Sequence, residues 1–105
     1  MKNFIDLKSL AIKDRLPGAT VAYFQAEHST VAYTDLQAGT EIPLHNHIQE
    51  AVDIILEGEL EMYIDGNTHI LKPGMMSFVP SNVFHKARAI SNCKVVTVLH
   101  PKRGL

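Results

Sequence analysis

Three histidines and a nearby carboxylate supply the residue types from which a metal site could be built. His45 and His47 stand two residues apart, Glu50 follows closely, and His85 comes later in a polar turn. On a β-strand, residues i and i+2 project from the same face, so the first two imidazoles would point the same way. Neutral imidazoles suit Fe, Mn, Ni, Cu or Zn, and a carboxylate favours Fe and Mn further. These residues therefore predict one divalent metal ion held by His45, His47, Glu50 and His85.

Length and charge narrow the class of protein. At 105 residues and 11.7 kDa the chain is large enough for one core and too small for two, so we expect a single domain over residues 1–105. Ten basic residues nearly cancel eleven acidic ones. Without a long basic run, nucleic acid and anionic membranes are not expected partners. No apolar run approaches the roughly 18 residues that span a bilayer.

The lone Cys93 has neither a disulfide partner nor a Cys-x-x-Cys motif. We interpret it as a small structural residue rather than a reactive thiol, and we expect a reducing, cytoplasmic location.

Short strands separated by Gly, Pro and Asn dominate the rest of the pattern. Asp65-Gly66 predicts a two-residue hairpin, because a type I′ turn needs positive φ at both positions. Eight or nine antiparallel strands with tight turns predict a β-barrel or a double-sheet jelly roll. The expected strands are Thr20–Gln25, Thr30–Leu36, Ile42–His47, Ala51–Leu56, Glu59–Ile64, Thr68–Leu71, Met76–Val79, Lys86–Ala89 and Lys94–Leu99.

The first 19 residues fit this strand pattern less well. The segment Ile5–Asp14 could form a helical turn or two, or residues 1–19 could form an arm that lies against a second subunit. Its apolar residues and the exposed edge of the barrel favour pairing between identical chains, so we expect a homodimer. The apolar residues are Phe4, Ile5, Leu7, Leu10 and Ile12.

The two histidine-containing segments resemble the paired motifs of the cupin superfamily. The first, about residues 39–58, has the order Gly39, five residues, His45-Asn46-His47, two residues, Glu50, seven residues, Gly58. The second, about residues 74–89, has the order Gly74, five residues, Pro80-Ser81-Asn82, two residues, His85. This resemblance implies a small single-domain cupin: an all-β, double-stranded β-helix, or jelly-roll barrel, of antiparallel strands. It also implies metal-binding roles for His45, His47 and His85.

The spacing around Glu50 departs from the cupin motif. One residue fewer than usual separates it from His47, and one more separates it from Gly58. Counted back from Gly58, the carboxylate position falls on Ala51, which cannot bind a metal. Three alternatives follow: a β-bulge brings Glu50 into the site, the amide oxygen of Gln49 replaces it, or the histidines act alone.

Two further positions differ in the second motif. Asn82 replaces a glycine, a mild change because Asn tolerates positive φ, and Ala89 replaces the terminal Asn.

Asp53 interrupts an apolar run and is the candidate catalytic residue. In the cupin register counted from Gly58, Asp53 would face the barrel interior close to the metal. A buried carboxylate there could act as a general acid or base. Alternatively, it faces outward, toward a dimer interface or a hydrogen-bonded sheet edge.

The resemblance to cupins, together with these residues, implies three possible functions. The first is a metal-dependent enzyme acting on an oxygen-rich small molecule such as a sugar acid, lyase- or isomerase-like, or a dioxygenase if the metal is Fe(II). The second is a non-enzymatic module that binds or senses a small molecule. The third is a metal-free isomerase or epimerase, against which the three matching histidines count. The sequence has no nucleophile elbow and no phosphate-binding or dinucleotide-binding glycine motif.

Overall fold

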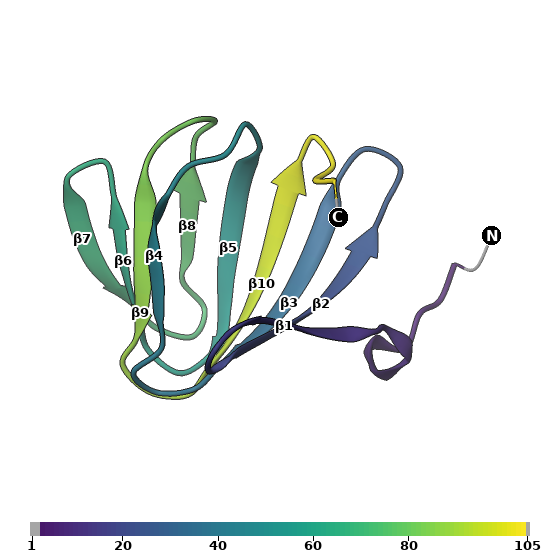
Figure 1. The fold of residues 1–105 in the computed structure, drawn as a ribbon, viewed down its shortest axis with the longest axis horizontal. Helices are drawn as coiled ribbons and strands as arrows, with labels where there is room; N and C mark the ends of the chain where they lie inside the picture. Colours follow the sequence, from purple (N-terminus) through teal and green to yellow (C-terminus); the bar gives the residue numbers. More distant parts are fainter. Residues whose placement is uncertain (1–2, 105) are drawn as a thin grey trace.

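A computed structural model describes residues 3–104 as two facing antiparallel β-sheets with one short helical turn (Figure 1). The predicted all-β jelly-roll barrel is confirmed. The elements are η1 (Leu7–Ser9), β1 (Ile12–Leu16), β2 (Ala19–Gln25), β3 (Thr30–Leu36), β4 (Glu41–His45), β5 (Glu50–Glu57), β6 (Leu60–Ile64), β7 (Asn67–Leu71), β8 (Met76–Val79), β9 (His85–Ala89) and β10 (Cys93–His100).

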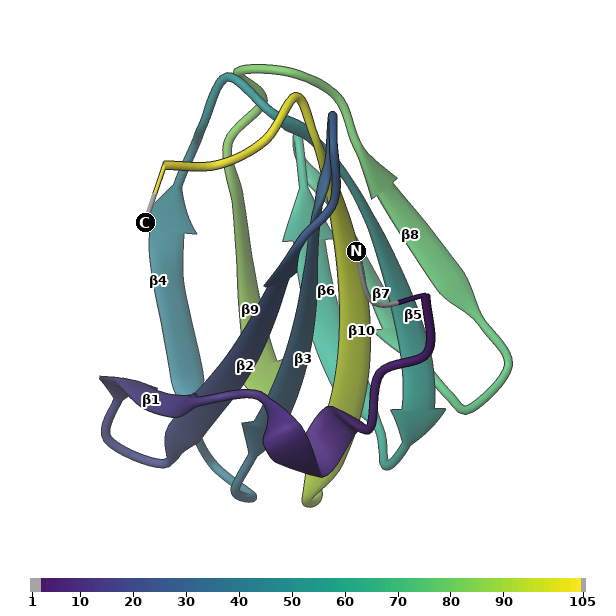
Figure 2. The same ribbon diagram turned by 90° about the vertical axis from the view of Figure 1, so that its right-hand side faces the viewer.

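The larger sheet has the strand order β1-β2-β3-β10-β5-β8, and the smaller has the order β4-β9-β6-β7. Sequence neighbours therefore often lie in different sheets, as Figures 1 and 2 show for β4 and β5. The connections β4–β5 and β8–β9 lie at one end of the barrel, which we call the open end. The turns β1–β2 and β9–β10 lie at the other, the closed end.

All nine expected strands have a counterpart in the structure, and β1 is an additional strand. The segment Ile5–Asp14 contains only the turn η1 before β1 begins. The sequence of β1 has no apolar alternation that would indicate a strand, because β1 is an edge strand with four exposed residues out of five. In Figure 1 the N-terminal segment leaves the body of the barrel and projects to one side. Met1 and Lys2, part of the expected arm, lie outside the described residues.

Two turn predictions are borne out by the backbone. Asp65 and Gly66 both have positive φ, 48° and 87°, as the predicted hairpin requires. Asn82 has a φ of 65°, so the residue that replaces the motif glycine adopts the left-handed conformation. Gly58 could not be replaced in the same way, because a Cβ there would lie 2.1 Å from the carbonyl oxygen of Asn92.

The main hydrophobic core fills the closed end between the two sheets. Ile55 of β5 is only 1 % exposed and Ala89 of β9 is fully buried. Cys93 also lies in this core, where its Sγ is 3.2 Å from the carbonyl oxygens of Glu59 and Ser91. Burial raises the pKa of the Cys93 thiol, which suits a structural residue. The cluster comprises Ala19, Leu36, Ile55, Leu60, Met62, Leu71, Ala87, Ala89, Cys93 and Val95.

No helix among residues 3–104 has the length and apolar character needed to cross a membrane.

Candidate metal centre

A bulge in β4 brings the first histidine opposite the third. Ile42 pairs with Ala87 and His45 pairs with His85, so two residues of β4 oppose one residue of β9. Bulges of this kind turn side chains toward a site, and Pro43 within it suits an edge strand. His47 lies beyond the end of β4 rather than on it, so the expected strand Ile42–His47 is two residues too long.

The three imidazoles nevertheless converge. Their ring centroids are 4.1 Å apart for His45 and His85, 4.8 Å for His47 and His85, and 5.6 Å for His45 and His47. One potential ligand atom from each ring lies within 4.8 Å of the other two. His85 is buried, and the other two are half-buried.

Backbone carbonyls fix the orientation of all three rings. The Nδ1 atoms of His45, His47 and His85 lie 2.7, 2.8 and 2.9 Å from the carbonyl oxygens of Pro43, Gln49 and Val83 respectively. Because a carbonyl oxygen only accepts, each Nδ1 carries the hydrogen in these bonds. Each neutral ring then has its lone pair on Nε2, the arrangement in which outer-shell hydrogen bonds orient metal-binding histidines.

Burial also keeps two of the rings neutral. Desolvation lowers the pKa of His45 and His85, with hydrogen bonds to backbone carbonyls opposing the shift. Repulsion by neighbouring imidazoles adds to the lowering in both cases. A neutral imidazole is the form that binds a metal, so the surroundings of these rings favour the ligand state near neutral pH.

The side chains of Glu50 and Gln49 do not line the cavity of the three histidines. Glu50 is exposed at the start of β5, where it pairs with His100 of β10. Strand alternation therefore turns Ala51 inward and Glu50 outward. Gln49 is buried, but its Nε2 donates to the carbonyl oxygen of Lys102 at 3.4 Å, and neither residue lines the cavity of the histidines.

Asp53 faces the same cavity as the histidines. It is 9 % exposed, in line with the inward register expected from Gly58. Its Oδ1 accepts a hydrogen bond of 2.6 Å from Thr97 Oγ1, and its Oδ2 accepts one of 3.1 Å from Ser77 Oγ. Thr97 and Ser77 are its direct neighbours on β10 and β8. Two cross-strand hydroxyls therefore hold this carboxylate in place inside the barrel.

The donor set fits a divalent transition metal ion. Three neutral nitrogen ligands, each oriented by a carbonyl, are a combination that Fe, Mn, Ni, Cu and Zn accept. Among residues 3–104, the three histidines are the group of His, Cys, Asp or Glu side chains close enough to hold a metal ion.

The cavity around the histidines has a volume of about 70 Å³. Besides the histidines and Asp53 it is lined by Arg15, Tyr23 and Arg103, which were not predicted as site residues. Arg15 and Arg103 come from segments near the two ends of the chain and carry no motif, so only the fold brings them together.

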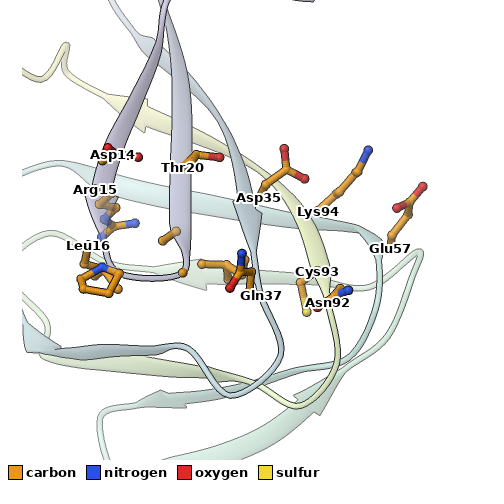
Figure 3. A pocket seen from close by; sticks show the side chains of 14 residues that line it. Asp14, Arg15, Leu16, Thr20, Asp35, Gln37, Glu57, Asn92, Cys93 and Lys94 are labelled. Carbon is orange, nitrogen blue, oxygen red and sulfur yellow. The ribbon is translucent and has the colours of Figure 1, made fainter.

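A second hollow of about 820 Å³ lies at the closed end and contains no histidine. Figure 3 shows Asp35, Lys94 and Glu57 extending from neighbouring strands there, and Arg15 is the one lining residue that it shares with the histidine cavity. Its lining includes acidic and basic side chains but no imidazole nitrogen that could bind a metal ion.

Comparisons with known proteins agree with this geometry. The family described as "Cupin domain" matches residues 32–99, which contain all three histidines and Asp53. The L-ectoine synthase of Hahella chejuensis is 37 % identical over 70 residues, covering 65 % of this chain and 53 % of that protein. The chain thus spans about half the length of the curated relatives that it matches.

Two solved structures share nearly the whole fold. An RmlC-like cupin from Shewanella frigidimarina has a TM-score of 0.91 at 23 % identity, with 98 % of this chain and 94 % of the other covered. KdgF from Halomonas sp. has a TM-score of 0.91 at 19 % identity, with 98 % and 96 % covered. At these identities the likeness concerns the fold alone.

Proposed function

The chain belongs to the cupin family, and we propose that it is a mononuclear metal protein in which His45, His47 and His85 bind one divalent ion. The observation that carries this proposal is the set of three Nδ1 contacts with carbonyl oxygens. They leave three Nε2 lone pairs on rings that already face one another, so little reorganisation is needed to bind an ion. The ion is one of Fe, Mn, Ni, Cu or Zn.

We propose further that the protein is an enzyme acting on a small, oxygen-rich molecule. A bound divalent ion supplies Lewis acidity toward a substrate oxygen. Asp53 lies in the same cavity, and its carboxylate can take up or release a proton at Oδ1 or Oδ2 while Thr97 and Ser77 keep it in place. The match to an L-ectoine synthase over 70 residues supports an enzymatic role without identifying the substrate.

A non-enzymatic binding protein is the second candidate. It is favoured by the two hydrogen bonds that Asp53 accepts from Thr97 and Ser77, which suit a structural role for this carboxylate as well as a catalytic one. A compound that binds at the metal site without being consumed would support this role, and a compound converted to product would support the enzyme.

Elemental analysis tests the metal proposal. We expect about one equivalent of a transition metal in the purified or reconstituted protein, and loss of at least about 90 % of it in His47→Ala, because a ligand is removed. His28→Ala is the matched control, since the His28 side chain is 78 % exposed on a turn. Equal metal contents in the two variants would contradict the proposal.

The outer face of the larger sheet supports a homodimer. Two registered rows of apolar side chains cross it: Tyr33, Val96, Ile54 and Met76, and beside them Val31, Val98, Val52 and Phe78. Met76 and Phe78 are 64 % and 54 % exposed. The projecting N-terminal segment adds Phe4, which is 91 % exposed. We propose that a second copy covers these apolar surfaces, because apolar patches of this kind usually mark an interface.

Light scattering tests the dimer. Val98→Glu is expected to yield monomers, because it places a charge in the middle of the proposed interface. Ile70→Glu is the control, since Ile70 is 47 % exposed on a strand of the other sheet. A wild-type protein with the mass of a monomer would refute the dimer.

A further inference from the structure

Two arginines line the cavity of the histidines, although they lie near opposite ends of the chain. Arg15 comes from β1 and Arg103 from the segment after β10. Arg15 is close enough to His45 and His85 to lower the pKa of both through charge repulsion. The cavity therefore has two guanidinium groups beside the candidate metal ligands, whereas the ammonium group of Lys86, which also lines it, lies over the ring of Tyr63.

A bulge in β1 positions Arg15. Asp14 pairs with Thr20 and Leu16 pairs with Ala19, so Arg15 is an extra residue without a partner on β2. The extra residue of a bulge is released from the alternation of the strand and can turn its side chain toward a site. Arg15 thus reaches the cavity, although β1 is an exposed edge strand.

Three connected hydrogen bonds with Thr30 and Gln25 position Arg103. Its backbone N–H donates to Thr30 Oγ1 at 2.9 Å, and its carbonyl oxygen accepts from Gln25 Nε2 at 2.8 Å. Thr30 in turn donates to the side chain of Gln25 and is fully buried. The β2–β3 hairpin therefore holds the C-terminal segment across the open end and keeps Arg103 at the cavity.

The positive charges of these arginines are only partly balanced, because the carboxylate of Asp53 lies in the same cavity and attracts Arg15 without forming an ion pair with it. The ion pairs found within the part of the chain that the structure describes involve other residues. Burial lowers the pKa of Arg15 and the charge of Arg103 adds to the lowering, whereas Tyr23 and the carboxylate of Asp53 oppose it. Two like charges that face one cavity repel each other, and such local conflicts are typical of binding sites. A bound anion would relieve this repulsion.

We propose that Arg15 and Arg103 form a carboxylate-binding pair, so that the ligand of this cavity is a small hydroxy or keto acid. The planar guanidinium donors match the two oxygens of a carboxylate. The volume of about 70 Å³ limits the buried part of the ligand to a few atoms. With its carboxylate on the arginines, the ligand presents its hydroxyl or carbonyl oxygen to the Nε2 side of the histidines and to Asp53. This inference rests on the proposed function, because it names the class of compound that the same site binds.

Calorimetric titration with L-lactate and its neutral counterpart L-lactamide tests the pair. The two probes differ in the charged group alone, so their ratio of affinities measures carboxylate recognition. We expect Co²⁺-loaded protein to bind lactate about tenfold or more tightly than lactamide, the effect of one charge-assisted hydrogen-bonded pair. Arg15→Gln and Arg103→Gln should each weaken lactate binding by about tenfold and leave lactamide binding and metal content unchanged.

Arg88→Gln is the matched control. Arg88 lies on β9 outside the cavity, where its Nε is 3.5 Å from Glu61 Oε1, and its replacement should leave lactate binding unchanged. Arg103→Lys retains the charge without the planar donors and should fall between wild type and Arg103→Gln.

Two results would overturn the proposal. Equal affinity of wild type and both glutamine variants for lactate would mean that the metal alone binds the carboxylate. Tighter binding of inorganic phosphate than of lactate would overturn the choice of a carboxylic acid.

Titration of the metal-free protein separates this inference from the metal proposal. If the arginines bind the carboxylate, metal-free wild type still prefers lactate to lactamide, and both glutamine variants lose that preference. The metal proposal is judged independently by elemental analysis of His47→Ala.

Discussion

The two ends of the barrel are built from the same strands but contain different chemistry. On β5, Ile55 lies in the closed-end core, whereas Asp53 faces the cavity. On β9, Ala89 belongs to the core and His85 to the metal centre. On β10, Val95 belongs to the core and Thr97 lines the cavity. On β5 and β10 the inward-facing positions thus change from apolar to polar over two residues, and at Ala51 and Leu99, two residues further on, they are apolar again.

The difference shows how a small barrel can tolerate a polar interior. Apolar burial at the closed end provides a driving force for folding. At the open end, polar side chains are hydrogen-bonded to backbone carbonyls or to neighbouring strands, and within residues 3–104 no buried side-chain nitrogen or oxygen lacks a partner. The polar end therefore avoids the cost of unsatisfied groups, and a smaller apolar cluster of Ala51, Val79 and Leu99 adds burial beside the histidine cavity. Four predictions test this division.

The largest effect is expected from Ile55→Ala at the closed end. Because this side chain is 1 % exposed in the main core, its truncation should lower the free energy of unfolding by about 3 kcal/mol. Metal affinity should stay within about threefold of wild type, since Ile55 does not line the histidine cavity. Urea unfolding and metal titration measure the two quantities. A large loss of metal affinity in the folded variant would show that the two ends are coupled.

A smaller loss is expected from Thr97→Val at the open end. The substitution keeps the shape of the side chain and removes the 2.6 Å hydrogen bond to Asp53. It should lower the free energy of unfolding by about 1–2 kcal/mol, because a buried carboxylate oxygen loses its donor. Thr68→Val on an exposed position of β7 is the control. Equal stabilities of the two variants would mean that Asp53 does not need this partner.

Lowering the pH should destabilise the metal-free protein through the open end. Burial lowers the pKa of His45 and His85 below the ordinary 6.5, so just below pH 6.5 the unfolded chain binds more protons than the folded one. Their contribution to stability is therefore complete above pH 6.5 and decreases as the pH falls through that value. Urea unfolding between about pH 8 and about pH 5 measures the decrease. The double variant His45→Gln, His85→Gln should lose less stability over this pH range. If it loses as much as the wild type, the loss does not come from these two histidines.

The smallest effect is expected from Glu50→Gln. This residue is exposed and lies outside the cavity, so metal affinity should change by less than about threefold, as expected for a surface charge. Isothermal titration with the metal found in the protein measures it. A loss comparable to that of His47→Ala would instead show that Glu50 reaches the metal.

The turns of the barrel and the three histidines of the candidate site could be predicted from the sequence, because they depend on strong local patterns. The turns at Asp65-Gly66 and Asn82 each depend on the chemistry of a few adjacent residues, and the structure agrees with both. The convergence of His45, His47 and His85 followed from the resemblance to the cupin motifs, because two of these residues stand two positions apart in the chain and the third is placed by the barrel topology.

Other features depend on contacts that a local pattern does not contain. The side on which Glu50 lies is set by the strand register, and a one-residue shift would reverse it. Strand β1 lacks an apolar alternation because it is an exposed edge. Arg15 reaches the cavity through a bulge and Arg103 through bonds to Thr30 and Gln25, and neither arrangement leaves a recognisable pattern in the sequence.

X-ray absorption spectroscopy at the edge of the bound metal is the most direct test of the three-histidine site. The account predicts scattering from three imidazole rings in the wild-type protein and the same three in Glu50→Gln, with the ions bound in a ratio of about one per chain. Two or fewer imidazoles in the wild type, or no bound metal after reconstitution, would contradict it.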